Sequence, residues 1–302
     1  MANVTYATKT LNLIESMIAK DQGAKYRGHL GQVIGHMGDA YRTDEDGHRS
    51  HMGASMLGGE CARSIWYNFH WATKSAFTGR LLRLFNRGHL EEARFIAMLL
   101  TIGCEVYQQD ANGNQFRISF AEGHAGGSGD GVVIGIPDLP PGTPALCEFK
   151  TSGDKPFQEL KAKGMRDAKF EHYVQMNLYM YKMGLPVGLY MAVNKNNDEL
   201  YGEIITLDTA IAEQFVDRGT TLVWMQDPPK KMNESPGFFK CRWCDHRPVC
   251  HLKAKPDRNC RTCAHSKPVA GAQWTCTLHD AFIDKETQLT GCENYIPHKV
   301  FE

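Results

Sequence analysis

The feature that most restricts the fold of this chain is the distribution of its cysteines. Ten cysteines occur in 302 residues, and seven of them lie between residues 241 and 292. The N-terminus lacks the apolar core of an export signal, so we expect a soluble, cytoplasmic protein. Clustered cysteines in that setting bind metal more often than they form disulfides. The C-terminal region is therefore predicted to fold around metal.

Composition and charge set further limits. Hydrophobic residues make up 42% of the chain and charged residues 23%, as in a globular protein with a sizeable core. Lysine plus arginine equals aspartate plus glutamate, at 34 each, so no overall field attracts a polyanion. A nucleic-acid site must therefore be a local patch. No apolar run approaches the length of a membrane span, so we expect no membrane partner.

Hydrophobic periodicity divides the chain into helical and strand-like segments around a Gly/His/Asp-rich polar loop at 35–55. The predicted helices cover 10–20, 61–73, 81–102, 170–184 and 207–226. The predicted strands cover 104–109, 115–121, 130–136, 145–151, 187–194 and 199–206. This pattern predicts an α/β fold with a mixed sheet flanked by helices.

One strand-like run, ALCEFKTSG at 145–153, carries charges at its centre. Residues two apart on a strand point to the same face, so Glu148 and Lys150 should lie side by side among apolar neighbours. A solvated ion pair is the ordinary interpretation of such a short pattern. The rest of the chain is needed to favour a functional one.

A second acid precedes the neighbouring strand. Asp130 begins DGVVIGI, which should pair with the Glu148 strand across the turn PDLPPGTP. Two carboxylates brought that close repel each other unless a cation lies between them. Mg²⁺ is bound by one or two carboxylates and water, and Lys150 would then lie beside activated water or a phosphate oxygen. These residue types suit phosphodiester hydrolysis.

Two helices offer further candidates. Glu92 and His89 are one turn apart before the sheet, and either can add a metal ligand. Gln175 and Tyr179 share a face of the helix at 170–184. Each has an ordinary interpretation. Glu92 can form an ion pair with Arg94 or Arg87, Gln175 can be a solvent-side amide, and Tyr179 can be a half-buried core ring.

Together these residues resemble the motifs of the PD-(D/E)XK nuclease superfamily, and within it the RecB-like branch. Members of that branch carry, in order, a helical acid or histidine, an aspartate, a Glu-x-Lys pair and a Gln-x-x-x-Tyr pair. The residues that match, with His89 as the alternative at the first position, are Glu92, Asp130, Glu148, Lys150, Gln175 and Tyr179. The resemblance spans residues 55–252 and is greatest to phage exonucleases and CRISPR-associated RecB-like exonucleases.

The resemblance implies a restriction-endonuclease-like core that cleaves DNA. It implies that Glu92 (or His89), Asp130 and Glu148 hold Mg²⁺ or Mn²⁺ and that Lys150 assists hydrolysis. It further implies that Gln175 and Tyr179 position the substrate strand. A phage-encoded protein of this kind would act in the host cytoplasm, with recombination or replication proteins as further partners.

The cysteines form two sets. Cys61 precedes the core, and Cys241, Cys244 and Cys250 follow it with C-x2-C-x5-C spacing. Four thiolates suit a [4Fe–4S] cluster or zinc, and spacing does not choose between them. The resemblance favours iron–sulfur, because one thiolate before the core and three behind it is the pattern of iron–sulfur nucleases. Cys104 and Cys147 are expected in the core.

The second set lies in the C-terminal tail, which departs from the nuclease pattern. Cys260, Cys263, Cys276 and Cys292 are typical of a small structural zinc module, with His265 and His279 as substitute ligands. The expected domains are a helical segment contributing Cys61, the nuclease core, the iron–sulfur segment and a zinc-ribbon-like module, at 1–80, 81–228, 229–252 and 253–302.

Local charge agrees with a DNA path. Residues 150–169 hold six Lys or Arg against three acids, and residues 230–258 hold eight against three. A solvated loop is the alternative for 150–169. The aromatic residues at 66–71 can stack bases, but packing of their helix is the more ordinary role.

The sequence thus predicts a metal-dependent DNA exonuclease. Two alternatives stay open: an inactive nuclease fold that binds DNA or a recombination partner, and a structure-specific endonuclease or resolvase on the same fold.

Overall fold

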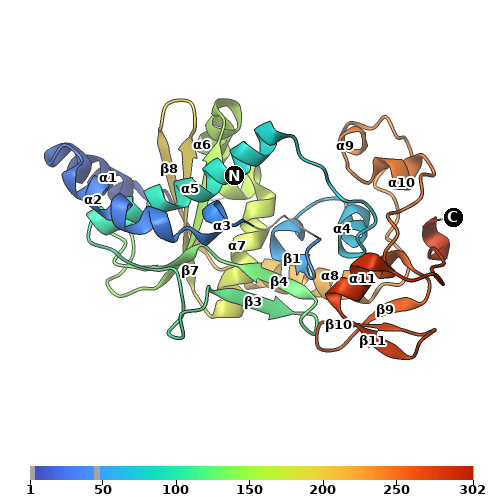
Figure 1. Ribbon diagram of the computed structural model, residues 1–302. Coiled ribbons are helices and arrows are strands. Elements are labelled where there is room, and N and C mark those ends of the chain that lie inside the picture. The colour runs from blue at the N-terminus through green and yellow to red at the C-terminus, as the bar shows by residue number, and fades with distance from the viewer. Residues whose placement is uncertain (1–3, 44–47, 302) are drawn as a thin grey trace. The chain divides into compact units, whose positions relative to one another are not determined.

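The computed structural model describes residues 4–43 and 48–301, so four residues of the predicted polar loop, 44–47, lie outside it (Figure 1). The chain divides into two compact units, each assembled from separated stretches. The first contains residues 1–45, 77–118 and 128–212, and the second contains 46–76, 119–127 and 213–302. The units thus differ from the four consecutive segments expected above, because strands and helices far apart in sequence pack together.

The first unit is built on a five-stranded mixed sheet, as the strand pattern predicts. The strand order is β2-β5-β6-β7-β8, with β6 and β7 parallel and the other neighbours antiparallel. The strands are β2 (Glu105–Tyr107), β5 (Gly131–Ile134), β6 (Ala145–Ser152), β7 (Val187–Asn194) and β8 (Leu200–Thr206). The predicted pairing of the Asp130 and Glu148 strands is confirmed, since Gly131 lies opposite Cys147.

Helices cover both faces of this sheet. One group consists of α1 (Thr8–Lys20), α2 (Ala24–Val33), α3 (Gly38–Tyr41) and α5 (Gly79–Thr101). The other consists of α6 (Asp154–Ala168) and α7 (Phe170–Met183). Two glycines show how closely they approach: a Cβ on Gly202 would meet Leu11 of α1, and one on Gly188 would meet Met176 of α7.

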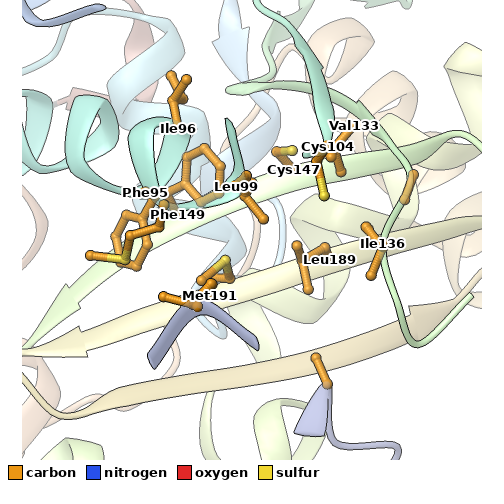
Figure 2. Close-up of a cluster of buried hydrophobic side chains, with 14 of the residues drawn as sticks. Phe95, Ile96, Leu99, Cys104, Val133, Ile136, Cys147, Phe149, Leu189 and Met191 are labelled. Carbon is orange, nitrogen blue, oxygen red and sulfur yellow. The ribbon is translucent and has the colours of Figure 1, made fainter. Parts of the chain in front are cut away.

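The α5 side of the sheet holds the main hydrophobic core (Figure 2). The rings of Phe95 on α5 and Phe149 on β6 are stacked with centroids 5.0 Å apart, and both are buried. Cys104 and Cys147 lie in the same core, as predicted. Because alternate residues of β6 face α5, the intervening Glu148 and Lys150 face α7 instead.

The segment 150–169 is not the loop that its polar composition suggests. It continues β6 and then forms α6, in which Lys163 pairs with Glu159 at 2.7 Å and Lys161 pairs with Glu199. Part of its positive charge is therefore compensated within the fold.

The second unit is richer in aromatic residues and short elements. Strands β9 to β11 form an antiparallel three-stranded sheet. A second three-stranded sheet has the order β1-β4-β3 and consists of β1 (Met52–Gly53), β4 (Ala125–Ser128) and β3 (Arg117–Phe120). The chain passes from the first unit to the second within β3 and returns within β4. The bounds of β9 to β11 are Ser266–Val269, Gln273–Cys276 and Ala281–Ile283. The helices are α4 (Ala62–Phe69), α8 (Thr209–Trp224), which enters from the first unit, α9 (Phe239–Arg242), α10 (Arg247–His251) and α11 (Lys285–Thr290).

Aromatic packing, rather than base stacking, is the role that the structure gives to the 66–71 segment. Trp66, Tyr67, Phe69 and Trp71 are all buried.

Within the described residues, no helix is both long and apolar enough to cross a membrane.

The core packing predicts a large stability difference between two substitutions. Phe149→Ala should lower the free energy of unfolding by about 3–5 kcal/mol, because it removes a buried ring and leaves a cavity against Phe95. Leu82→Ala, at a position on α5 that is 46% exposed, should change it by less than about 0.5 kcal/mol. Chemical denaturation measures both. Equal losses would contradict the core described here.

Candidate active site

The central strand β6 carries a fully buried carboxylate. Glu148 has no exposed surface, and it lies beside Tyr190 of the parallel strand β7. Lys150, two residues further on the same face, forms an ion pair with Glu148 Oε1 and keeps 29% of its side chain exposed. The predicted juxtaposition of Glu148 and Lys150 is therefore present, but as a buried pair rather than a solvated one.

Asp130 completes an acidic pair with Glu148. The backbone N–H of Phe149 donates to Asp130 Oδ2 at 2.7 Å, which fixes the Asp130 carboxyl against β6. Burial and then the Glu148 carboxylate raise the pKa of Asp130 well above its usual range, although Lys150 opposes the shift. Two acids and one lysine thus lie close together, and only Glu148 among them is fully buried.

A glycine after Asp130 makes this arrangement possible. Gly131 has φ +154°, and a Cβ there would lie 2.8 Å from the carbonyl oxygen of Tyr107 on β2. Any other residue would push β5 away from β2. Gly131, the last residue of the GSGDG run, is therefore required for the close approach of β5 to β2.

The electrostatic surroundings of Lys150 include two residues that sequence reasoning missed. Burial alone would lower the pKa of Lys150, but the Glu148 and Asp130 carboxylates outweigh it and raise the pKa. His172 on α7 accepts or donates a 3.0 Å hydrogen bond with the Tyr190 hydroxyl. Burial, and then Lys150, lower the pKa of His172 to about 3, so its imidazole is neutral at physiological pH.

Helix α5 supplies Glu92 and His89. His89 Nδ1 lies 3.6 Å from Glu92 Oε1, and the hydrogen-bonding Glu92 carboxylate raises the pKa of His89. Glu92 also contributes to the raised pKa of Asp130, so the helix acid lies near the strand acids. The structure therefore brings the predicted first position together with Asp130.

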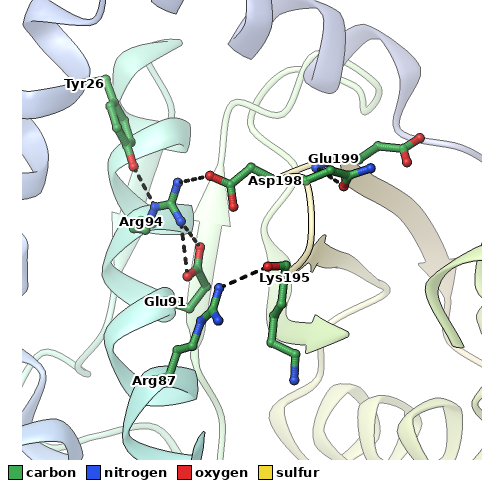
Figure 3. A network of polar contacts seen from close by, with 8 residues as sticks. Tyr26, Arg87, Glu91, Arg94, Lys195, Asp198 and Glu199 are labelled. Atoms are coloured by element: carbon green, nitrogen blue, oxygen red, sulfur yellow. Dashed lines mark hydrogen bonds and ion pairs between the residues drawn. The ribbon is translucent and has the colours of Figure 1, made fainter. Parts of the chain in front are cut away.

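The adjacent acid, Glu91, points elsewhere (Figure 3). Its carboxylate pairs with Arg94 at 3.0 Å, and Arg94 also contacts Asp198 at 3.2 Å and the Tyr26 hydroxyl at 3.1 Å. The ordinary ion pair considered for Glu92 with Arg94 is thus made by Glu91. This network ties α5 to α2 and to the β7–β8 turn, and it leaves Glu92 on a different side of the helix.

A polar hollow of about 640 Å³ opens beside these residues. It is lined by His89, Glu92 and Asp130, together with His36 and Asp39 from the N-terminal segment and the stretch 106–110. His36 and Asp39 were visible in the sequence only as part of the polar loop at 35–55. The hollow is large enough to admit a nucleotide-sized group to the acids.

Gln175 and Tyr179 lie on α7, the helix that faces Glu148 and Lys150. Both are buried, so Gln175 is not the solvent-side amide of the ordinary interpretation. A Cβ on Gly129 would approach the Tyr179 ring to 3.7 Å, which places that ring next to the residue preceding Asp130.

The donor chemistry of the acids fits a hard divalent cation. Within the described chain, Glu148 Oε2 is buried and has no hydrogen-bond partner, so it retains an acceptor for a cation. Carboxylate oxygens are the protein ligands that Mg²⁺ and Mn²⁺ prefer. Across residues 4–43 and 48–301, however, no three His, Cys, Asp or Glu side chains are already grouped as a metal site. A bound ion would have to draw these side chains together.

Each predicted cysteine set lines one small pocket of the second unit. The first pocket is lined by Cys61, Cys241, Cys244 and Cys250, together with Arg63 and Lys231. The second pocket is lined by His265, with Leu278 and Tyr295, and by all four cysteines of the second set: Cys260, Cys263, Cys276 and Cys292. His279 Nε2 lies 3.9 Å from Cys292 Sγ.

No protein-family model matches the sequence, and no curated protein matches it significantly. Among solved structures, the alkaline exonuclease LHK-Exo from Laribacter hongkongensis is 15% identical, with a TM-score of 0.40 over 58% of this chain and 87% of that chain. The same exonuclease in complex with dAMP also has a TM-score of 0.40 at 15% identity, over 57% and 86%. The protein SSO0001 is 14% identical, with a TM-score of 0.39 over 76% and 97%. These values are too low to assign a family, so the function must be argued from the site.

The raised pKa of Asp130 predicts a specific pH dependence. Above the ordinary pKa of 3.8 the folded state holds the Asp130 proton more tightly than the unfolded state does. This contribution to stability is therefore present at low pH and is lost as pH rises towards the folded-state pKa. Asp130→Asn should remove this loss of stability. The slope of the unfolding free energy against pH should therefore change by at most about 1.4 kcal/mol per pH unit.

Chemical denaturation at a series of pH values between 4.5 and 8, without added divalent ions, measures the difference between the two proteins. Glu171→Gln, at an exposed position on α7, is the matched control and should leave the slope unchanged. Parallel curves for wild type and Asp130→Asn would refute the proposed burial of this carboxyl.

Proposed function

We propose that this chain is a divalent-metal-dependent nuclease that hydrolyses phosphodiester bonds in DNA. The observation that carries the proposal is the buried Glu148 carboxylate, paired with Lys150 and adjoining Asp130, next to a polar hollow that Glu92 and His89 line. Buried acids arranged in this way are costly unless they serve a cation.

Each residue has a defined role in this proposal. Asp130 and Glu148 would hold Mg²⁺ or Mn²⁺, and Glu92, with His89 as the alternative, would complete the site from α5. When bound, the ion supplies a Lewis acid that activates water and offsets charge on the phosphate. Gln175 and Tyr179 would position the substrate strand from α7.

Lys150 is suited to stabilise negative charge. Its ammonium is held by the Glu148 carboxylate, and its raised pKa keeps it protonated at physiological pH. A protonated amine beside the hollow can donate to a phosphate oxygen as charge develops in the transition state. Tyr190 and the neutral His172, which are hydrogen-bonded to each other, are electrostatically coupled to Lys150.

We further propose that the chain acts as an exonuclease. A structure-specific endonuclease on the same site would cleave circular DNA, whereas an exonuclease requires an end. The form of the DNA therefore separates the two activities.

The decisive assay compares end-labelled linear, nicked and closed circular DNA with Mg²⁺ or Mn²⁺. We expect linear DNA to be degraded and closed circles to survive. Glu148→Gln should reduce the cleavage rate at least about a hundredfold, because it removes a proposed ligand of the metal ion. A hundredfold reduction corresponds to about 2.7 kcal/mol of lost transition-state stabilisation. Lys150→Met should reduce it comparably while retaining Mn²⁺ binding.

The control for this assay is Glu171→Gln, which should cleave at the wild-type rate. Circular dichroism shows whether each variant is folded. Wild-type rates from a folded Glu148→Gln protein would exclude this site as the nuclease centre, and cleavage of closed circles would replace the exonuclease by an endonuclease.

We also propose that the two cysteine sets bind different metals in structural roles. Cys61, Cys241, Cys244 and Cys250 would hold a [4Fe–4S] cluster, with Arg63 and Lys231 offsetting its negative charge. The second set would hold zinc. Burial and then the three neighbouring thiols raise the pKa of Cys260 to about 11, so a metal would have to displace the thiol proton on binding.

Elemental analysis of anaerobically purified protein tests the two sets separately. We expect iron and one zinc per chain in the wild type. Cys61→Ser should lose iron and the brown colour, and Cys276→Ser should lose zinc but keep iron. Cys104→Ala, in the core of the first unit, should keep both. Two zinc ions and no iron would contradict the cluster assignment and leave the nuclease assignment standing.

A further inference from the structure

Two strongly exposed aromatic side chains flank Cys241 in the first cysteine segment. Phe239 is 64% exposed and Trp243 is 84% exposed. The other tryptophans differ sharply, because Trp66, Trp71 and Trp274 are 1% exposed and Trp224 is 40% exposed. Exposing a whole indole to water is unfavourable, so an exposed aromatic pair of this kind indicates a binding surface.

The backbone holds this pair in place. Phe239 begins the single turn of α9, and Trp243 is the residue that directly follows its last residue, Arg242. The Arg242 N–H donates to the Phe238 carbonyl at 2.9 Å, and the Cys244 N–H donates to the Cys241 carbonyl at 3.2 Å. The Phe238 ring packs against Phe239 with centroids 4.7 Å apart. A ligand therefore meets rings whose backbone is already ordered.

The charge around the rings is positive. Lys240 Nζ lies 5.6 Å from the Phe239 ring centroid, and Arg242 is exposed between the two rings in sequence. Residues 230–258 contain eight Lys or Arg and three acids. Lys240 pairs with Glu60, whose side chain is 67% exposed, so solvent screens this ion pair.

This combination fits an unpaired nucleic-acid strand better than a protein surface. Protein interfaces are depleted of lysine, whereas here Lys240 lies against the Phe239 ring. Single strands instead need aromatic faces for the bases and cations for the phosphates. Duplex DNA offers its bases only at its ends, so the rings favour a single-stranded segment.

We propose that Phe239 and Trp243 form a stacking platform for the bases of single-stranded DNA, with Lys240 and Arg242 binding the flanking phosphates. The class of partner rests on the proposed nuclease function. The platform itself contains none of the proposed catalytic residues, so the two ideas can fail independently.

Tryptophan fluorescence tests the platform directly, because Trp243 is far more exposed than the other tryptophans. The probe is a twelve-residue oligothymidylate, added to the full-length chain carrying Glu148→Gln so that DNA is not consumed. We expect the oligonucleotide to quench the fluorescence and to protect it from acrylamide. Adding Trp243→Phe should remove most of that change, whereas Trp224→Phe should retain it.

Affinity measured by anisotropy of a labelled oligonucleotide provides the second readout. Trp243→Ala should weaken binding roughly tenfold, the usual effect of losing one stacked base. Lys240→Ala and Arg242→Ala should each reduce the slope of log affinity against log salt by about 0.7. Lys20→Ala, at an exposed position on α1 of the other unit, is the control for a lysine outside the platform and should leave the slope unchanged.

Three results would overturn the platform. One is oligonucleotide binding that neither quenches Trp243 nor weakens in Trp243→Ala. Another is an acrylamide-inaccessible Trp243 whose exposure depends on protein concentration, since a second copy would then cover it. The third is binding of duplex and single strand with equal affinity and equal quenching. Failure of wild-type protein to cleave DNA would refute the nuclease proposal but leave these measurements interpretable.

Discussion

A carboxylate without exposed surface in the centre of the sheet governs the architecture of the first unit. Glu148 lies on β6, which is hydrogen-bonded to β5 on one side and β7 on the other, so the carboxylate cannot turn outward without breaking the sheet. A buried charge costs several kcal/mol unless it is compensated. Lys150 compensates one oxygen, and the other has no hydrogen-bond partner within the described chain. The fold therefore maintains an unsatisfied acceptor next to a second acid, an arrangement that a divalent cation would relieve.

The sequence predicted the parts of this site that depend on local periodicity. Alternation along β6 places Glu148 and Lys150 on one face, and the short turn after β5 brings Asp130 beside them. Tyr190 and His172 were not predictable in this way, because the position of Tyr190 beside Glu148 depends on the parallel register of β6 and β7, and His172 reaches Tyr190 from α7. Nothing in the local pattern of VGLYMAVN distinguishes Tyr190 from a core ring.

Two other features were hidden for different physical reasons. Neighbouring helix residues point about 100° apart, so Glu91 and Glu92 face different surroundings. Only the contacts of Arg94 with Tyr26 and Asp198 show which acid is structural. The helix α6 was obscured by its polar composition and by Gly164, whose φ of +75° interrupts it. Its place next to α7 is set by packing, which outweighs these weak helix signals.

In the second unit each cysteine set lines one pocket, but the aromatic packing around Cys260 and Cys263 was not foreseen. Arg261, between Cys260 and Cys263, is buried against the rings of Trp71 and Trp274, 3.8 and 4.5 Å from their centroids. It donates to the carbonyls of Phe69 and Ser50, each at 2.9 Å. Burial lowers its pKa to about 9.

The position of Arg261 couples the second cysteine set to the aromatic core. Its guanidinium is held by ring faces and carbonyl dipoles, together with the Gln288 side chain at 2.8 Å, so its orientation must be fixed closely. Cys260 directly precedes Arg261 and Cys263 follows it by two residues, and both line one pocket, so movement of this segment would move the guanidinium. A metal that fixes Cys260 and Cys263 would therefore also stabilise the packing of Phe69 and Trp71. Phe69 is the last residue of α4, which begins directly after Cys61, and Trp71 follows two residues later. The two cysteine sets are in this sense joined through a single aromatic core.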